Sequence, residues 1–230
     1  MKTHDFARRI LLTAAATSCF LIPAPAATIY DNSVNDLVTR FSPGPLEIGD
    51  EVILAGTERF LTKFSFEYYG TNTASGGNPP FGGTVMAQVR FYLNDGTPYN
   101  TYPTPGTMFY NSGLFAVTSP TDRNIFVFDA GLDFPANGLF IPADSFTWSV
   151  QFSGMGPNDE LGVDIYDPPA VGGNHTDYWE YNGGWRLLTN AVNMNFAAKM
   201  EGVVPEPSGI VVAVLGGAIL LVAGCKLRRN

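Results

Sequence analysis

The chain has 230 residues, of which 45% are hydrophobic and 13% aromatic, a composition that excludes a disordered protein. It carries 13 bases against 21 acids, and the formal net charge of -8 argues against binding to nucleic acid. The two cysteines, Cys19 and Cys225, lie near the chain ends, which excludes disulfides and thiol chemistry from the body of the protein.

The first 26 residues have the parts of a secretory signal peptide. A leader with three bases precedes a short apolar segment over residues 10–22. Ala24-Pro25-Ala26 then offers the small-x-small pattern of a signal peptidase site. We therefore expect signal peptidase to cut after Ala26, so that the mature chain starts at Ala27.

Residues 27–203 form the expected ectodomain, and their pattern is that of strands and turns. Apolar and polar residues alternate with a period of two, and no window has a convincing helical period. Phe60, Phe64, Phe66 and Tyr68, for example, are expected to share one core-facing row. The strands expected in chain order are 28–31, 51–55, 59–68, 84–93, 108–110, 114–118, 124–129, 146–152, 161–166, a hairpin over 178–188, and 192–200.

This pattern predicts an all-β fold, an antiparallel β-sandwich with jelly-roll-like connections. Gly, Pro and Asn concentrate in residues 71–83 and 94–106, which we expect to be mobile loops. The ectodomain holds 7 bases against 19 acids, a net charge of -12. Such a surface favours cationic or neutral partners.

The ectodomain has few residues that suggest catalysis. His175 is its single histidine, and no GxSxG, HExxH, CxxC or phosphate-loop motif occurs. We expect His175 to lie on a solvated turn and the protein not to be an enzyme. A glycoside hydrolase stays open as an alternative, because paired carboxylates have no fixed spacing in sequence; it requires two acids facing each other in a cleft.

Four acids between residues 159 and 167 could supply oxygen ligands to Ca²⁺, although they lack the spacing of an EF-hand loop. No other cofactor is expected. The candidate ligands are Asp159, Glu160, Asp164 and Asp167.

Aromatic residues gather in DYWEYNGGW, residues 177–185. Exposed Tyr and Trp rings stack on the apolar faces of sugars, so Tyr178, Trp179 and Trp185 are candidate carbohydrate contacts. Alternation places Tyr178 opposite Trp179, which means that one of the two faces the core. Stabilisation of the hairpin, with Trp185 as a cross-strand partner, is the favoured interpretation of these rings.

The C-terminal segment, residues 204–230, begins with Val-Pro-Glu-Pro and continues into an apolar span. Residues 208–225 carry no charge and are long enough, as a helix, to cross a bilayer with little tilt. The bases after this span, which include Arg228 and Arg229, are retained on the cytoplasmic side. We therefore expect one transmembrane helix with the ectodomain outside the cytoplasm.

The order of Pro205-Glu206-Pro207, a single span and Arg228-Arg229 resembles the PEP-CTERM sorting signal of Gram-negative bacteria. This resemblance implies recognition by an exosortase, a membrane enzyme thought to cleave near the Pro-Glu-Pro motif. It also implies an association with exopolysaccharide or biofilm. The resemblance covers about 27 residues and does not extend to the ectodomain.

The sequence thus predicts an exported, non-enzymatic protein that is held in the inner membrane by its tail, then processed and placed at the cell surface or in a secreted matrix. Its expected partners are signal peptidase, an exosortase, the membrane before processing, and extracellular polysaccharide. Two alternatives differ in class: a carbohydrate-binding module with a site near Trp179 and Trp185, and a surface protein that keeps its membrane anchor permanently.

Overall fold

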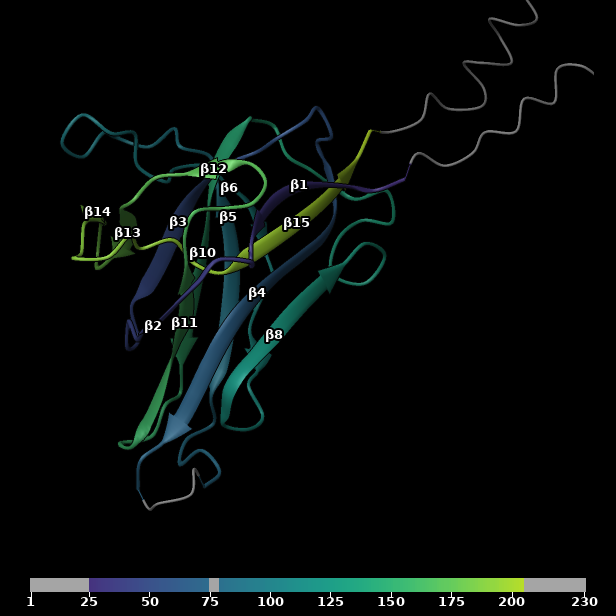
Figure 1. The fold of residues 1–230 in the computed structure, drawn as a ribbon. Coiled ribbons are helices and arrows are strands. Elements are labelled where there is room, and N and C mark those ends of the chain that lie inside the picture. The colour runs from purple at the N-terminus through teal and green to yellow at the C-terminus, as the bar shows by residue number, and fades with distance from the viewer. Residues whose placement is uncertain (1–24, 75–78, 205–230) are drawn as a thin grey trace, which may run out of the picture. The chain divides into compact units, whose positions relative to one another are not determined.

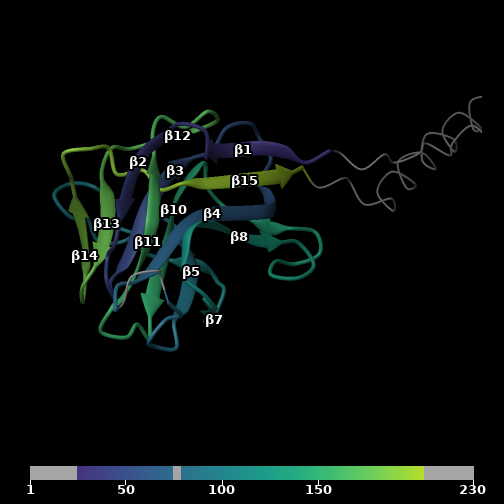
Figure 2. The same ribbon diagram turned by 60° about the horizontal axis from the view of Figure 1, so that its bottom comes forward.

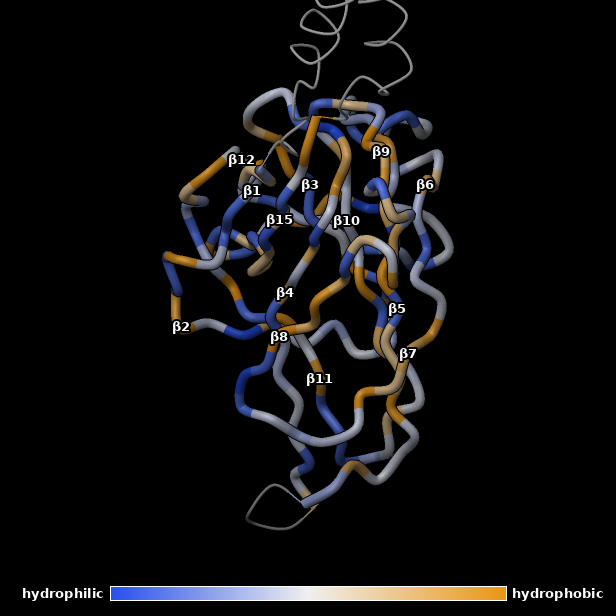
Figure 3. The backbone as a smooth tube through the Cα atoms, turned by 90° about the vertical axis from the view of Figure 1, so that its right-hand side faces the viewer, coloured by the Kyte–Doolittle hydropathy of each residue, from blue (hydrophilic) through white to orange (hydrophobic). Residues whose placement is uncertain are grey.

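Strands with one apolar face pair into two antiparallel sheets, which pack against each other (Figure 1). The computed structural model describes residues 25–74 and 79–204. Figure 3 shows the basis of this arrangement, since the chain changes repeatedly between hydrophobic and hydrophilic residues along its strands. A strand of this kind gains stability only when its apolar face is covered, which the second sheet does.

The first sheet has seven strands, with β1, β15, β4, β11 and β2 in that order and with β8 and β9 also paired to β4. These strands are β1 (Ala27–Asn32), β2 (Asp36–Phe41), β4 (Phe60–Asn72), β8 (Thr121–Asp129), β9 (Leu139–Phe140), β11 (Asp159–Tyr166) and β15 (Ala198–Val203).

The second sheet has eight strands, with β14, β13, β3, β10, β5 and β6 in that order, while β12 pairs with β3 and β7 with β5. These strands are β3 (Glu47–Ile53), β5 (Met86–Tyr92), β6 (Met108–Asn111), β7 (Phe115–Ala116), β10 (Ser145–Ser153), β12 (Gly173–Asn174), β13 (Tyr178–Tyr181) and β14 (Trp185–Leu188). The sequence therefore predicted the all-β class and the pairing of strands into antiparallel sheets correctly.

The core between the two sheets is rich in aromatic residues. Trp148 of β10 lies with its ring centroid 5.3 Å from that of Phe64 and 5.5 Å from that of Phe66, both on β4. Phe91 of β5 makes an edge contact with Phe64 at 5.1 Å. All four side chains are almost completely buried. Burial of each such ring contributes about 1.5–3 kcal/mol to the stability of the fold, a contribution that needs no disulfides.

A bulge in β4 changes which residues at the start of that strand face the core. Pairing with β15 shifts between Lys63 and Leu61, and this irregularity reverses the alternation at the start of the strand. Leu61 is fully buried, whereas Phe60 lies partly exposed and packs on Phe140 at 5.2 Å. The prediction that Phe60 belongs to the core row was therefore wrong, while Phe64, Phe66 and Tyr68 are buried as predicted.

Other strand predictions also differ from the structure, among them those for the last strand and for β2. The last strand begins at Ala198 rather than at residue 192, although Met194 and Phe196 before it are buried as expected. The sequence analysis missed β2, because its alternation is broken at Val38. This residue has a positive φ of 54°, and its N–H donates to Asp36 Oδ1.

The first and last strands of the described chain lie side by side (Figures 1 and 2). Ala27, the expected first residue of the mature protein, is also the first residue of β1 and pairs with Gly202 of β15. Residues Ala26–Val204 form one compact unit. Over the described residues, no helix is long and apolar enough to cross a membrane.

Candidate functional site

Most of the predicted processing signals lie outside the described residues. These are the sorting residues Pro205, Glu206, Pro207, Arg228 and Arg229, the span 208–225, and Ala24 of the signal peptidase site. Ala26 precedes β1 and Ala27 begins it. The processing signals therefore stay predictions.

The four candidate calcium ligands have separate partners. Asp159 accepts hydrogen bonds from the N–H groups of Gly82, Gly83 and Gly156, and although burial opposes the effect, these donors lower the pKa of its carboxyl. Glu160 accepts a hydrogen bond from the hydroxyl of Tyr69 at 2.9 Å. Each of these two carboxylates is thus directed to a structural contact of its own.

Asp164 and Asp167, the other two candidates, are also engaged. Asp164 pairs with Arg40, while Asp167 accepts hydrogen bonds from Asn193 and Asn195 at 2.6 Å each. Across residues 25–74 and 79–204, no three His, Cys, Asp or Glu side chains are grouped so that they could hold a metal ion. The calcium site stays a prediction.

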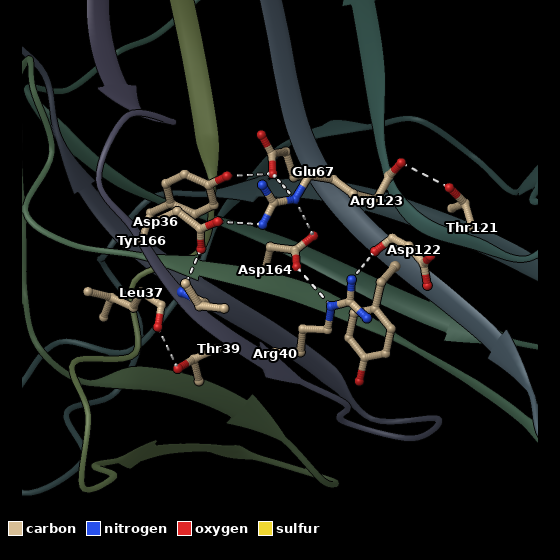
Figure 4. Close-up of polar contacts among 12 residues, drawn as sticks. Asp36, Leu37, Thr39, Arg40, Glu67, Thr121, Asp122, Arg123, Asp164 and Tyr166 are labelled. Carbon is tan, nitrogen blue, oxygen red and sulfur yellow. Dashed lines mark hydrogen bonds and ion pairs between the residues drawn. The ribbon is translucent and has the colours of Figure 1, made fainter.

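A network of charges ties four strands together on the outer face of the seven-stranded sheet (Figure 4). Arg123 of β8 contacts Asp36 of β2 at 2.6 Å and Glu67 of β4 at 3.3 Å. Arg40 of β2 contacts Asp164 of β11 at 3.4 Å. Sequence reasoning missed this network, because its members come from four distant segments.

The acids of this network are shielded by their partners. The Asp164 side chain is only 1% exposed, and burial raises its pKa despite Arg123 and Arg40 nearby. Burial likewise raises the pKa of Glu67, which accepts a hydrogen bond from the Tyr166 hydroxyl at 2.9 Å. These groups contact one another across strands, and their geometry indicates a structural role.

The outer face of the eight-stranded sheet is organised around Glu47 of β3. This buried carboxylate accepts hydrogen bonds from Arg90 Nη1 and Ser149 Oγ at 2.6 Å each, and from the Tyr92 hydroxyl at 3.0 Å. The three donors come from β5 and β10, so Glu47 fixes the side chains of three adjacent strands. Tyr92 is held across the sheet in this way.

The three predicted aromatic contacts lie in three environments. Tyr178 belongs to the core, with its ring centroid 5.0 Å from that of Phe41. Trp179 faces the outer side of the sheet, yet it is only 2% exposed. The expectation that one of these two faces the core is therefore confirmed, with Tyr178 as the core residue, while Trp179 is buried on the opposite side. Trp185 pairs with Tyr181 across the hairpin, as expected, and also contacts Tyr92 at 5.5 Å.

Trp179 lies in a pocket of about 200 Å³ on this outer face. We call it the flap pocket, because a hairpin between β5 and β6 contributes part of its wall. The residues that line it are Glu51, Tyr102, Pro103, His175, Asp177, Trp179 and Leu187. They come from β3, the hairpin, the segment before β13, and the β13–β14 pair.

The hairpin covers residues 93–107, and we call it the flap. Its backbone hydrogen bonds hold it in place beside the pocket. Backbone hydrogen bonds link Leu93 with Thr107, Gly96 with Thr104, and Tyr99 with Tyr102. Asn100 and Thr101 at its tip both have positive φ, as a tight two-residue turn requires. The segment 94–106, which we expected to be a mobile loop, thus contains a paired hairpin, while its mobility stays a prediction.

The charge of the flap pocket differs from that of the network in Figure 4. Its lining residues in the described ranges include Glu51, Asp177 and His175 but no lysine or arginine. Burial raises the pKa of Glu51, and the nearby His175 opposes this effect. His175 is exposed, as expected for a turn, but it also lines the pocket. The arrangement can accept hydrogen bonds and attract positive charge.

Comparison with protein-family models, with curated proteins and with solved structures finds no match to this chain. Of the aromatic candidates, only Trp179 lines the flap pocket. Sequence reasoning missed Glu51 and Tyr102, although the near-symmetric PYNTYP, residues 98–103, is a signal of the hairpin that carries Tyr102.

Proposed function

We propose that this protein is exported, processed at its C-terminal signal and placed at the cell surface or in the extracellular matrix, without being an enzyme. The observation that carries this proposal is the position of the domain boundaries. The compact unit spans Ala26–Val204, between the expected signal peptidase site and Pro205-Glu206-Pro207. Removing both terminal segments would leave every described strand in place.

The pairing of β1 with β15 explains why the domain can keep its fold when both terminal segments are removed. The two strands that join the ectodomain to its terminal signals are hydrogen-bonded to each other, and β15 also pairs with β4. Two cuts outside these strands would not open the sheet. Neighbours such as β1, β15, β4 and β11, which are distant in sequence, support a jelly-roll-like fold as part of the proposal.

The intact mass of the mature protein from its native host tests this proposal. A chain that starts at Ala27 and ends near Pro207 is the expected result. A mass that includes Asn230 would instead support the permanent membrane anchor. Incubation of the same protein with polysaccharides should release no reducing ends, whereas release would support the glycoside hydrolase, since Glu51 and Asp177 line one pocket.

A second candidate function, carbohydrate binding, is favoured by the flap pocket. Tyr102 is 56% exposed there and offers its ring to solvent. The Tyr181–Trp185–Tyr92 cluster extends the aromatic surface on the same face of the sheet. Retention of the protein on immobilised polysaccharide, with loss of retention on Tyr102→Ala, is the expected result. Equal retention of the variant would count against this function.

A further inference from the structure

The acids of the flap pocket have no lysine or arginine partner, unlike several acids elsewhere in the domain. Glu47 contacts Arg90 at 2.6 Å, and Asp31 contacts Lys199 at 3.1 Å. For Glu51 and Asp177, the described chain supplies no lysine or arginine nitrogen within 4.0 Å. Two acids without a lysine or arginine partner, beside a partly buried pocket, favour a positively charged ligand.

The aromatic residues of the pocket also favour a positively charged ligand, and they favour one that contains a ring with an apolar face. The face of a tyrosine ring attracts a cation, and it also packs on the apolar face of a sugar ring. Tyr102 is accessible for both contacts, whereas Trp179 is too deeply buried to stack and forms the floor. Leu187 and Pro103 complete an apolar rim. The pocket thus combines acceptors for an amine with a surface for a ring.

The surface beside the pocket is suited to a polymer. Trp185 lies between Tyr181 and Tyr92, with ring centroids 5.2 Å and 5.5 Å away. By strand alternation, these rings share the outer face with Trp179. Further sugar units of a chain anchored in the pocket could contact them, and a lone amine would not use this surface.

We propose that the flap pocket binds an amino sugar whose amine is free and protonated, as one unit of a polysaccharide. Glu51 and Asp177 accept hydrogen bonds from the ammonium group, and Tyr102 packs on the sugar ring. This inference rests on the second candidate function, carbohydrate binding, and is independent of the proposal on export and processing.

Calorimetry on the purified mature protein tests the inference with three tetrasaccharides of the same linkage. The glucosamine tetramer has free amines, the N-acetylglucosamine tetramer has acylated ones, and cellotetraose has none. We expect the glucosamine tetramer to bind at least about tenfold more tightly than the other two. Asp177→Asn and Tyr102→Ala should each weaken this binding by about tenfold or more.

Matched variants separate the pocket from general charge attraction. Asp122→Asn removes an exposed acid on the other sheet, and Tyr99→Ala removes the other tyrosine of the flap tip, which does not line the pocket. Both should bind the glucosamine tetramer as the unchanged protein does. Melting temperatures of all four variants establish that each is folded.

The other outcomes overturn the inference in distinguishable ways. Equal binding of the three tetramers, or preference for an uncharged one, would overturn amine recognition and leave carbohydrate binding intact. Binding of none would overturn both. Binding of tetralysine as tight as that of the glucosamine tetramer, or an equal loss with Asp122→Asn, would reduce the effect to general attraction of cations by an acidic domain.

Discussion

The outer faces of the two sheets use acidic residues in opposite ways. On the seven-stranded sheet, Glu67 and Asp164 are held by Arg123 and Arg40, and little of them reaches solvent. On the eight-stranded sheet, Glu47 is held in the same manner by Arg90, but Glu51 nearby faces a pocket without a basic partner. Acids that pair with arginine hold neighbouring strands together, whereas acids without a lysine or arginine partner remain available to a cationic ligand.

The largest expected effect comes from breaking the network of the seven-stranded sheet. Arg123→Ala leaves Glu67 and Asp164 with less compensation, and we expect a loss of about 2 kcal/mol in the free energy of unfolding at pH 7. This value is at the low end for a buried pair because Arg123 is 43% exposed. Urea denaturation measures it, and Arg186→Ala, which removes an exposed arginine of β14, is the control.

The pH dependence of that loss follows from the raised pKa values of Glu67 and Asp164. A carboxyl with a raised folded pKa supports folding below its unfolded pKa and loses that support as the pH rises through the folded pKa. Removing Arg123 raises both values further. The gap between variant and unchanged protein should therefore be smaller at pH 4 than at pH 7. A gap independent of pH would contradict this account.

The next effect concerns the ion pair of the eight-stranded sheet. Glu47→Gln replaces a carboxylate that accepts three hydrogen bonds, one of them from Arg90, and should cost about 1.5 kcal/mol. Loss of the Tyr92 contact should also change the fluorescence of Trp185. Glu180→Gln on β13 is the matched control. If Glu47→Gln left the free energy of unfolding unchanged, the contact between Glu47 and Arg90 would not stabilise the eight-stranded sheet as the Arg123 network stabilises the other.

A stabilising change of about 1 kcal/mol at pH 7 is expected for Asp50→Asn. Asp50 lies on β3 but faces the core, where burial raises the pKa of its carboxyl far above the usual value. The unfolded chain loses this proton at lower pH than the folded chain, so the native state is penalised as the pH rises between the two values. Asparagine can still accept the hydrogen bond from Phe196 N–H.

Thermal denaturation between pH 4 and pH 8 measures this effect. The variant should melt at a temperature several degrees higher than the unchanged protein near neutral pH, and the difference should shrink toward pH 4. A lower melting temperature at every pH would show that the Asp50 carboxyl makes a contact that the amide cannot replace.

The smallest effect on stability is expected at the flap pocket. Tyr102→Ala removes an exposed ring, while the flap keeps its backbone hydrogen bonds, so the free energy of unfolding should change by no more than about 0.5 kcal/mol. A loss above 1 kcal/mol in urea denaturation would make Tyr102 a structural residue. Tyr102 would then stabilise the fold itself, and it would no longer count among the groups that the eight-stranded sheet leaves available to a ligand.

Much of the fold was predictable from periodicity, because a strand with one buried face must alternate. This held for Phe64, Phe66 and Tyr68 of β4 and for the row on β10. It failed where the backbone departs from regular geometry. A bulge exchanged Leu61 for Phe60 in the core, and the positive φ of Val38 concealed β2. Neither irregularity leaves a periodic signal.

The candidate site was predictable only in part. The aromatic segment 177–185 indicated the region of the pocket correctly. In the structure, however, Tyr178 lies in the core and Trp179 forms the floor of the pocket. Glu51 and Tyr102 carried no local signal of function. They lie about 50 residues apart in the sequence and face one pocket only because β3, β13 and the flap meet on one side of the sheet.

The sequence by itself determined the all-β class, the absence of cysteine from residues 27–203 and the excess of acids there, since these depend on composition and local periodicity. Only the tertiary structure decided which acids receive basic partners. The domain has far fewer bases than acids, and strand order brings Arg40, Arg90 and Arg123 to Asp164, Glu47 and Glu67. The pairing of charges depends on contacts between distant segments, which local sequence does not encode.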